Sequence, residues 1–313
     1  MALRHRLANG PLVNRFNRAQ PRTRPNTAIM GYRSRPLFVR PAAAVLGAIF
    51  GACLSTGLSA AGAQRPDTGS RDAAALAALE IAETEAVVEI VDGDTLVLAD
   101  GRQVRLVGLQ APKLPLGRPG FKAWPLAEDA KAVLGELTLG RAVTLGYGGR
   151  RGDRHGRALA HLFDETGRWI QGALIDRGMA RIYSFSDNRA LVPEMLAREA
   201  AARAAGRGIW ALQAYAVRDA AAVPARLSGF ELVEGRVAET ATVRKRTYLN
   251  FGADWRSDFT VSLAPKARKL FEAEGIDPLS YRGKLVRVRG WLKSYNGPLI
   301  EATHPEQIEV IEE

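Results

Sequence analysis

Carboxylates and arginines follow one another along the chain in an order that suits chemistry on a phosphodiester. Asp92 and Asp94 flank a glycine in a short acidic motif. Arg105 lies in a strand-like segment, and Arg157 directly follows a glycine-rich loop. Carboxylate oxygens bind hard divalent cations, and a guanidinium group can bind a phosphate through two parallel N–H groups. These residue types together indicate a site that binds a phosphodiester, with or without hydrolysing it.

The segments that carry these residues have the pattern of a small β-barrel with helices. Apolar and β-branched runs between Asp-Gly pairs predict a three-stranded meander, and Pro125 at a first helical turn predicts a helix after it. The order of elements fits an α+β, mainly β, architecture built on a five-stranded oligonucleotide/oligosaccharide-binding (OB) barrel. Strands are expected at 86–91, 95–98, 103–109, 141–147, 157–163 and 179–183, and helices at 126–134, 169–177 and 192–205.

Four motifs in this region resemble those of the staphylococcal nuclease (thermonuclease) family. They are Asp-Gly-Asp-Thr at 92–95, Arg-Leu-Val-Gly-Leu at 105–109 followed by Ala-Pro, His-Gly-Arg-Ala-Leu-Ala at 155–160, and Gly-Ile-Trp at 208–210. The resemblance covers residues of about 86–210 and keeps the order and spacing of the motifs. It implies an OB-fold barrel with helices and calcium-dependent hydrolysis of DNA or RNA.

The resemblance also implies roles for single residues. Asp94 corresponds to a calcium ligand, and Arg105 and Arg157 correspond to the arginines that stabilise the transition state on the phosphate. Gln110 stands where a second calcium carboxylate is expected, and Lys113 stands where the general base is expected. A neutral amide weakens a calcium site, and a protonated lysine neither activates water nor tolerates a nearby divalent ion. Two active-site acids are therefore replaced.

These replacements leave two hypotheses for the first domain. An active enzyme would be a metal-dependent nuclease with a weakened calcium site, in which Asp92 or Asp153 replaces a missing acid. The alternative is a catalytically inactive module of the cell envelope that binds nucleic acid, another polyanion or a protein. Each residue also has a purely structural interpretation: Asp92 and Asp94 as turn residues, the arginines as strand or loop side chains, and Lys113 as a solvated charge.

A second β-rich unit is expected at 229–313, and we interpret it as another OB-like barrel. Its strand candidates are 232–238, 246–251, 258–263, 285–292 and 308–311, with a helix near 266–274. Bases alternate with aromatic residues here, as on surfaces that stack nucleobases and bind phosphates. The alternative is a solvated outer face above core aromatics. The nucleic-acid-binding candidates are Arg246, Tyr248, Arg287, Arg289 and Trp291.

The remaining chain divides into a leader at 1–63, linkers at 64–84 and 212–228, and the thermonuclease-like domain at 85–211. The polar and then alanine-rich segment 64–84 is consistent with a linker or with a short exposed helix. The net charge of +11 comes mostly from the leader, since 1–63 hold nine arginines and no acid. Three of these arginines precede the apolar run 42–58, and small residues follow at 61–63, which is typical of an export signal.

The leader predicts a periplasmic or secreted protein, with an uncleaved membrane anchor or lipidation at Cys53 as alternatives. Because Cys53 is the single cysteine, no disulfide partner exists within the chain.

Overall fold

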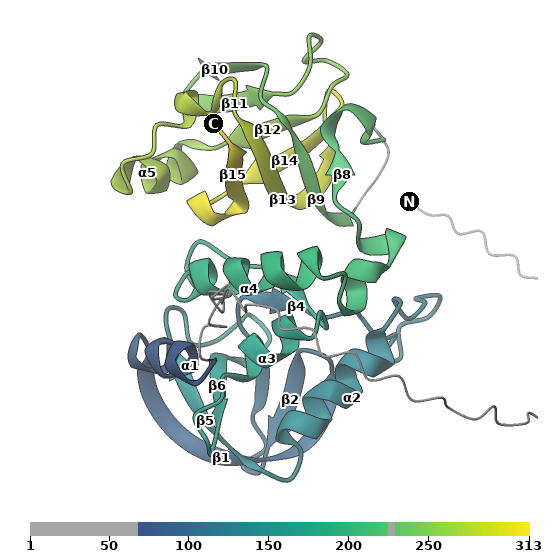
Figure 1. Ribbon diagram of the computed structural model, residues 1–313, viewed down its shortest axis with the longest axis vertical. Coiled ribbons are helices and arrows are strands. Elements are labelled where there is room, and N and C mark those ends of the chain that lie inside the picture. The colour runs from purple at the N-terminus through teal and green to yellow at the C-terminus, as the bar shows by residue number, and fades with distance from the viewer. Residues whose placement is uncertain (1–67, 225–228) are drawn as a thin grey trace, which may run out of the picture. The chain divides into compact units, whose positions relative to one another are not determined.

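The computed structural model of the protein describes residues 68–224 and 229–313 (Figure 1). The predicted leader, with its cleavage site, its membrane anchor and Cys53, lies outside the described residues. Within these two ranges, none of the helices combines the length and the apolar character that a membrane crossing requires.

Five strands form a closed barrel in the first domain, as the sequence predicts. Around the barrel the order is β1 (Glu80–Asp92), β2 (Thr95–Leu98), β3 (Gln103–Leu106), β6 (Ala158–Asp164) and β5 (Ala142–Tyr147). Alternating side chains of these strands, such as Leu96 and Leu98 on β2, are fully buried in one continuous core. β3 pairs in parallel with β6, with Arg105 opposite Leu159. This pairing brings together two motifs that lie far apart in the sequence.

Helices cover the barrel and a two-stranded ribbon stands beside it. The helices are α2 (Ala127–Thr138), α3 (Ile170–Asp176) and α4 (Val192–Ala204). The strand expected at 179–183 is β7 (Arg181–Ile182), which pairs with β4 (Leu109–Gln110) instead of entering the barrel. Two short 3₁₀ turns, Gly208–Ala211 and Gln213–Tyr215, end this domain.

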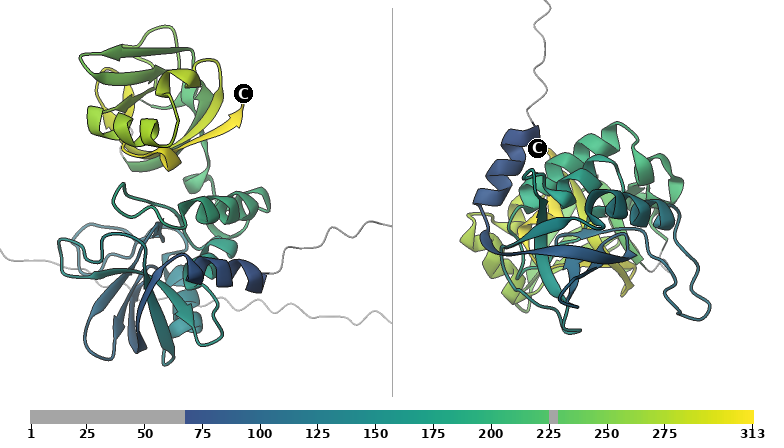
Figure 2. Two further views of the ribbon diagram at one scale, coloured as in Figure 1. Left: turned by 90° about the vertical axis from the view of Figure 1, so that its left-hand side faces the viewer. Right: turned by 90° about the horizontal axis from the view of Figure 1, so that it is seen from below.

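The segment expected to be the first linker has a structural role in the barrel domain. Helix α1 (Thr68–Ala77), dark blue in Figure 2, places Asp72 in a buried position. Asp72 pairs with Arg198 of α4 at 2.5 Å and accepts a hydrogen bond from the Trp169 N–H. β1 also begins earlier than expected, at Glu80. The alanine-rich composition of the segment gave no indication that Asp72 is buried and attaches the helix to the barrel domain.

The second domain is one curled sheet of eight strands, and it contains all five expected strand segments. Its order is β10-β11-β12-β14-β13-β9-β8, with β15 also paired to β13, so the sheet does not close on itself as the first barrel does. The helix α5 (Pro265–Ala273) lies where the sequence predicts one. The expected second linker includes β8 and a 3₁₀ turn at Ala220–Ala222. The strands are β8 (Arg218–Asp219), β9 (Gly229–Arg236), β10 (Glu239–Val243), β11 (Arg246–Asn250), β12 (Thr260–Leu263), β13 (Leu285–Ser294), β14 (Pro298–Ala302) and β15 (Ile308–Glu312), with further 3₁₀ turns at Pro278–Tyr281 and Pro305–Gln307.

Arg289 of β13 connects the sheet to the barrel domain. It is fully buried and forms ion pairs with Glu199 of α4, at 2.8 Å, and with Glu309 of β15. Burial of Glu199 disfavours its ionised form, but the charge of the neighbouring Arg289 prevails and holds the pKa of Glu199 below its ordinary value. The prediction that Arg289 binds nucleic acid is therefore wrong, because its guanidinium is inside the protein.

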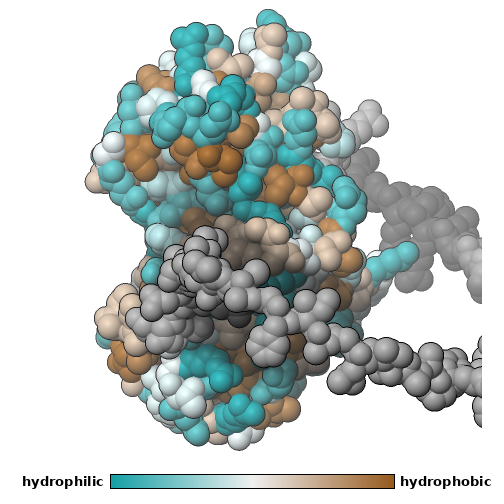
Figure 3. Space-filling view, in the orientation of Figure 1, coloured by the Kyte–Doolittle hydropathy of each residue, from teal (hydrophilic) through white to brown (hydrophobic). Residues whose placement is uncertain are grey.

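On the face seen in Figure 3, hydrophobic residues lie in small groups between hydrophilic ones.

Candidate functional site

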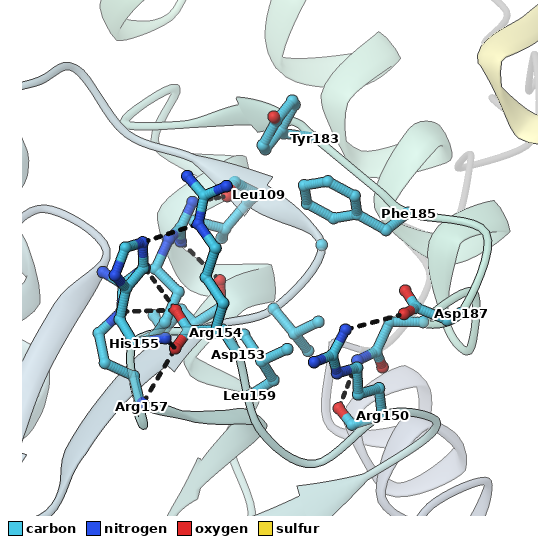
Figure 4. A pocket seen from close by; sticks show the side chains of 15 residues that line it. Leu109, Arg150, Asp153, Arg154, His155, Arg157, Leu159, Tyr183, Phe185 and Asp187 are labelled. Atoms are coloured by element: carbon cyan, nitrogen blue, oxygen red, sulfur yellow. Dashed lines mark hydrogen bonds and ion pairs between the residues drawn. The ribbon is translucent and has the colours of Figure 1, made fainter. Parts of the chain in front are cut away.

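A cleft of about 460 Å³ opens on the barrel where β3 and the loop before β6 meet (Figure 4). Arg105 and Arg157, the two predicted phosphate arginines, both line it. The other walls are the backbone of 106–109, the loop 150–155 and the aromatic pair Tyr183 and Phe185. The parallel pairing of β3 with β6 explains why the two arginines share one cleft.

Asp153 holds the Arg157 side chain in place. Arg157 donates from Nε to Asp153 Oδ2 at 2.8 Å, and its terminal nitrogen Nη2 lies 2.7 Å from the same oxygen. The backbone N–H groups of His155 and Arg157 donate to the other Asp153 oxygen. Burial acts to raise the pKa of Asp153, but these hydrogen bonds outweigh it and hold the pKa below its ordinary value. Asp153 therefore positions the loop, and its carboxylate is already engaged.

Arg105 is directed toward backbone oxygens. Its guanidinium donates to the carbonyls of Leu106 and Leu109, each at 2.7 Å, and lies 3.3 Å from Asp94 Oδ2. A guanidinium has five N–H donors, so these contacts fix its orientation without using all of them. Arg105 brings a fixed positive charge to the wall of the cleft.

Asp94 is fully buried in a tight turn behind Arg105. The turn depends on Gly93, because a Cβ there would lie 2.7 Å from the Cβ atoms of both Ala111 and Ala130. The N–H of Ala111 donates to Asp94 Oδ2 at 2.8 Å. The acidic motif is thus clamped between α2 and the segment that carries Gln110 and Lys113.

The ammonium of Lys113 occupies the position in front of these carboxylates. Its Nζ lies 2.6 Å from both oxygens of Asp94 and 3.3 Å from Asp92 Oδ2. The Lys113 side chain is 20% exposed, whereas Asp94 is fully buried. A cation bound by two carboxylates is the expected geometry of a metal site, and here the cation is the protein's own lysine.

The two aspartates respond to this environment in opposite directions. Burial acts to raise the pKa of Asp94, but the charges of Arg105 and Lys113 prevail and hold it below its ordinary value. For Asp92, burial and the nearby charge of Asp94 raise the pKa, and Lys113 offsets them only in part. Asp94 is thus the stably ionised partner of Lys113.

The side chain of Gln110 binds Arg181. Its Oε1 accepts from Nε and a terminal nitrogen of Arg181, at 3.1 and 2.8 Å, across the β4–β7 ribbon. Arg181 lies among aromatic rings, with its guanidinium carbon 4.8 Å from the Phe230 ring centre. The amide at 110 therefore satisfies a buried arginine.

The calcium ion that the family resemblance implies does not fit this arrangement. A hard divalent cation needs several oxygen ligands, most of them charged. The Asp94 oxygens already hold the ammonium of Lys113, and Gln110 binds Arg181. Over residues 68–224 and 229–313, no three His, Cys, Asp or Glu side chains come close enough to hold a metal ion.

Several cleft residues are not among the site residues predicted from the sequence. Arg150 and Arg154 come from the loop before β6, and Tyr183 and Phe185 follow β7. Arg154 bonds to His155 Nε2 at 3.1 Å and forms no ion pair with a carboxylate in the part of the chain that the structure describes. The four bases in the loop at 150–157 were the available signal. No sequence signal pointed to Tyr183 and Phe185, because their position in the cleft depends on the β4–β7 ribbon lying beside the barrel.

The nucleic-acid-binding candidates of the second domain do not form one surface. Arg287 pairs with Glu234 at 2.6 Å, and Arg289 is buried. Trp291 is 47% exposed and donates from Nε1 to the Tyr183 hydroxyl at 3.0 Å. Arg246 and Tyr248 line a separate groove.

The closed barrel, with its helices and its pairs of carboxylates and arginines, defines an OB-fold domain of the nuclease-like class. Residues 103–212 match the family model described as staphylococcal nuclease homologue, so the chain carries a domain of this family. The matched range includes Arg105, Arg157 and the replaced positions, and it begins after Asp94.

Curated relatives are similar to this chain over the same domain. An uncharacterized protein of Bacillus anthracis is 33% identical over 139 residues, which are 41% of this chain and 61% of that protein. A protein of Escherichia coli O157:H7 named an uncharacterized endonuclease is 29% identical over 127 residues, which are 40% of this chain and 74% of that protein. The match thus spans less than two thirds of the Bacillus anthracis protein.

Proposed function

We propose that the protein binds nucleic acid, DNA or RNA, in the cleft of its first barrel without metal-dependent cleavage. The observation that carries this proposal is the 2.6 Å contact of Lys113 Nζ with both oxygens of Asp94. A tethered ammonium at this position neutralises the carboxylate and repels a divalent cation. Phosphate binding by arginine needs neither a metal nor a base.

Hydrolysis would also need a group that activates water. A general base must reach the attacking water and accept its proton, and its loss alone lowers the rate by about 10²- to 10⁴-fold. The carboxylates near the cleft are paired with cations: Asp94 with Lys113 and Arg105, Asp153 with Arg157, and the exposed Asp187 with Arg150 at 3.8 Å. Lys113, at the expected position of the base, is a hydrogen-bond donor.

The cleft has the charge and the surface that a nucleotide requires. Its lining includes four arginines and two aspartates, so positive charge predominates. Arg154 offers a guanidinium to a phosphate, and Phe185 is 50% exposed, so its ring is open for stacking. Tyr183 packs edge-on against Phe185 with ring centres 4.8 Å apart, which holds that ring in place.

Metal-dependent nuclease activity is the second candidate, since relatives from Escherichia coli are named endonucleases. One assay separates the two. The purified chain is incubated with labelled single-stranded DNA and RNA, with calcium or with a chelator. We expect salt-sensitive binding that survives chelation, and no fragments. Calcium-dependent fragments that a chelator abolishes would show that the proposal is wrong.

Variants locate the binding and test the role of the lysine. Arg154→Ala should weaken binding several-fold and make the salt dependence shallower by about 0.7–0.9 for one lost phosphate contact. Arg141→Ala, an exposed arginine outside the cleft, is the matched control. Lys113→Glu with Gln110→Asp should introduce calcium-dependent cleavage. Lys113→Gln with Gln110→Asp, which lacks a new base, should not.

We further propose that the protein acts outside the cytoplasm, in the periplasm, as a secreted protein or anchored to the membrane. The arginine-flanked apolar run at 42–58 and the small residues at 61–63 support this. Cell fractionation with N-terminal sequencing of the recovered protein tests it. Recovery of the uncleaved chain from the cytoplasmic fraction alone would contradict it.

A further inference from the structure

A groove of about 660 Å³ crosses the curled sheet of the second domain. Its lining comes from β10, β11, β12, β14 and the turns between them, and includes Arg244, Arg246, Tyr248, Trp255 and Tyr295. We propose that this groove is a separate binding site for single-stranded nucleic acid. The inference rests on the proposed function only for the class of ligand, since none of these residues lines the cleft on the barrel.

Aromatic rings in the groove are open to solvent. Trp255 is 49% exposed and Tyr295 is 68% exposed, although large rings are usually buried for stability. They come from different segments, the loop between β11 and β12 and the turn between β13 and β14, and they line the same groove as Tyr248. Nucleobases stack on such rings whatever the base sequence, because every base has a π-face.

The charge of the groove selects an anionic ligand. Its lining residues include two arginines and no carboxylate. Arg246 contacts Glu301 at 3.0 Å, and Lys293 contacts the same carboxylate at 3.1 Å, so this group of three keeps a net positive charge. Arg244 makes no ion pair with any residue that the structure describes. Positive charges beside stacking rings match the phosphates and bases of a single strand.

The turn that carries Arg244 is an unusual place for two basic residues. Arg244 and Lys245 connect β10 to β11, with φ values of 48° and 70°. Two-residue hairpin turns with both φ values positive favour Asn-Gly, because a Cβ is strained in this region. The chain keeps two long cations at a position where Asn-Gly would fold more readily. A ligand-binding role for their charges accounts for the presence of arginine and lysine in this turn.

This strain provides a variant that separates binding from folding. Arg244→Asn with Lys245→Gly removes both charges and relieves the turn, so we expect its thermal unfolding midpoint to be at least that of the wild type. Its affinity for a labelled oligothymidylate of about 12 nucleotides should fall, and the slope of log K against log salt should become shallower by about 0.7–1.4. Lys266→Ala with Lys269→Ala, on exposed positions of α5 outside the groove, is the charge-matched control.

The aromatic residues are tested with the same labelled oligothymidylate, whose binding is followed by fluorescence anisotropy. Trp255→Ala and Tyr295→Ala should each weaken binding by about 5- to 100-fold with an unchanged salt slope, because a stacked base is lost and no phosphate contact is. Unchanged affinity in the turn variant and in both alanine variants would overturn the inference. A groove that binds a neutral oligosaccharide through Trp255 and Tyr295, and not the oligonucleotide, would overturn it as well.

Failure of this inference is distinguishable from failure of the proposed function. If only the groove proposal fails, Arg154→Ala weakens binding while the groove variants bind as the wild type does. If only the cleft proposal fails, the groove variants weaken binding and Arg154→Ala does not.

Discussion

Replacing Lys113 by methionine tests the central contact of the barrel domain. The substitution keeps an unbranched side chain as far as the ε position and removes the ammonium that lies 2.6 Å from both Asp94 oxygens. Removing one partner of a buried ion pair typically costs about 3–5 kcal/mol. Lys113 is partly exposed and Arg105 remains 3.3 Å from Asp94, so we expect a smaller loss of about 2–3 kcal/mol in the free energy of unfolding at pH 7.

The same substitution should change how stability depends on pH. In the wild type the pKa of Asp94 lies below its ordinary value of 3.8, so its ion pair stabilises the protein above about pH 4 and this stabilisation is lost as the pH falls through the folded-state pKa. Without Lys113, only Arg105 and the hydrogen bonds of Asp94 with Asp92 and the Ala111 N–H still oppose burial, so the pKa of Asp94 rises. The difference in stability between wild type and Lys113→Met should therefore shrink as the pH is lowered toward 4.

Urea unfolding followed by circular dichroism at pH 7 and pH 4 measures both effects. Asp92→Asn is the control, because burial and the charge of Asp94 raise the pKa of Asp92 and already disfavour its ionised form. The new amide keeps an acceptor for the N–H of Asp94, so stability should stay unchanged or rise. The reasoning fails if Lys113→Met unfolds like the wild type at pH 7, or if its deficit is the same at both pH values.

Two further outcomes follow from buried groups at the junction of barrel and sheet. Glu199→Gln leaves the buried Arg289 without its main partner and should lower the free energy of unfolding by about 3–5 kcal/mol. Adding Arg289→Met should restore part of this loss. A loss below about 1 kcal/mol in urea titrations would contradict the pairing. Burial lowers the pKa of His304 from 6.5 to about 4, so stability present above pH 6.5 should decline by up to about 3 kcal/mol as the pH falls toward 4. His304→Gln should show a correspondingly flatter profile, and an identical profile would exclude His304 as the cause.

The first barrel could be predicted from the sequence because its signals are local. Alternating apolar residues, Asp-Gly turns and the proline before α2 each act within a few residues, and they predict most of the barrel strands and the helices α2, α3 and α4. The early start of β1 at Glu80 and the pairing of β7 with β4 were not predicted. The family resemblance, and not the strand pattern, assigned Arg105 and Arg157 to one site; the parallel pairing of β3 with β6, which brings both arginines to one cleft, is known only from the structure.

The contacts of single charged side chains were decided only by the tertiary structure. Lys113 could be interpreted from the sequence as a lost base or a solvated charge, and it proves to be the cation that Asp94 holds. On β13, the alternation that was expected to present Arg289 on a binding face instead directs it toward Glu199, ninety residues away in the chain. In a strand, the side-chain period says which residues share a face, and what covers that face depends on distant segments.

In the groove of the second domain, too, the sequence indicated some of the lining residues and the tertiary structure brought them together with the others. The sequence indicated bases interleaved with aromatic residues, and Arg246 and Tyr248 are among those that line the groove. Trp255 and Tyr295 join them from two separate turns because the sheet curls. The sequence by itself determined which residue types were available and which strands would carry them. The tertiary structure decided which of their charges are neutralised and which stay open, since pairing and burial depend on contacts between segments far apart in the chain.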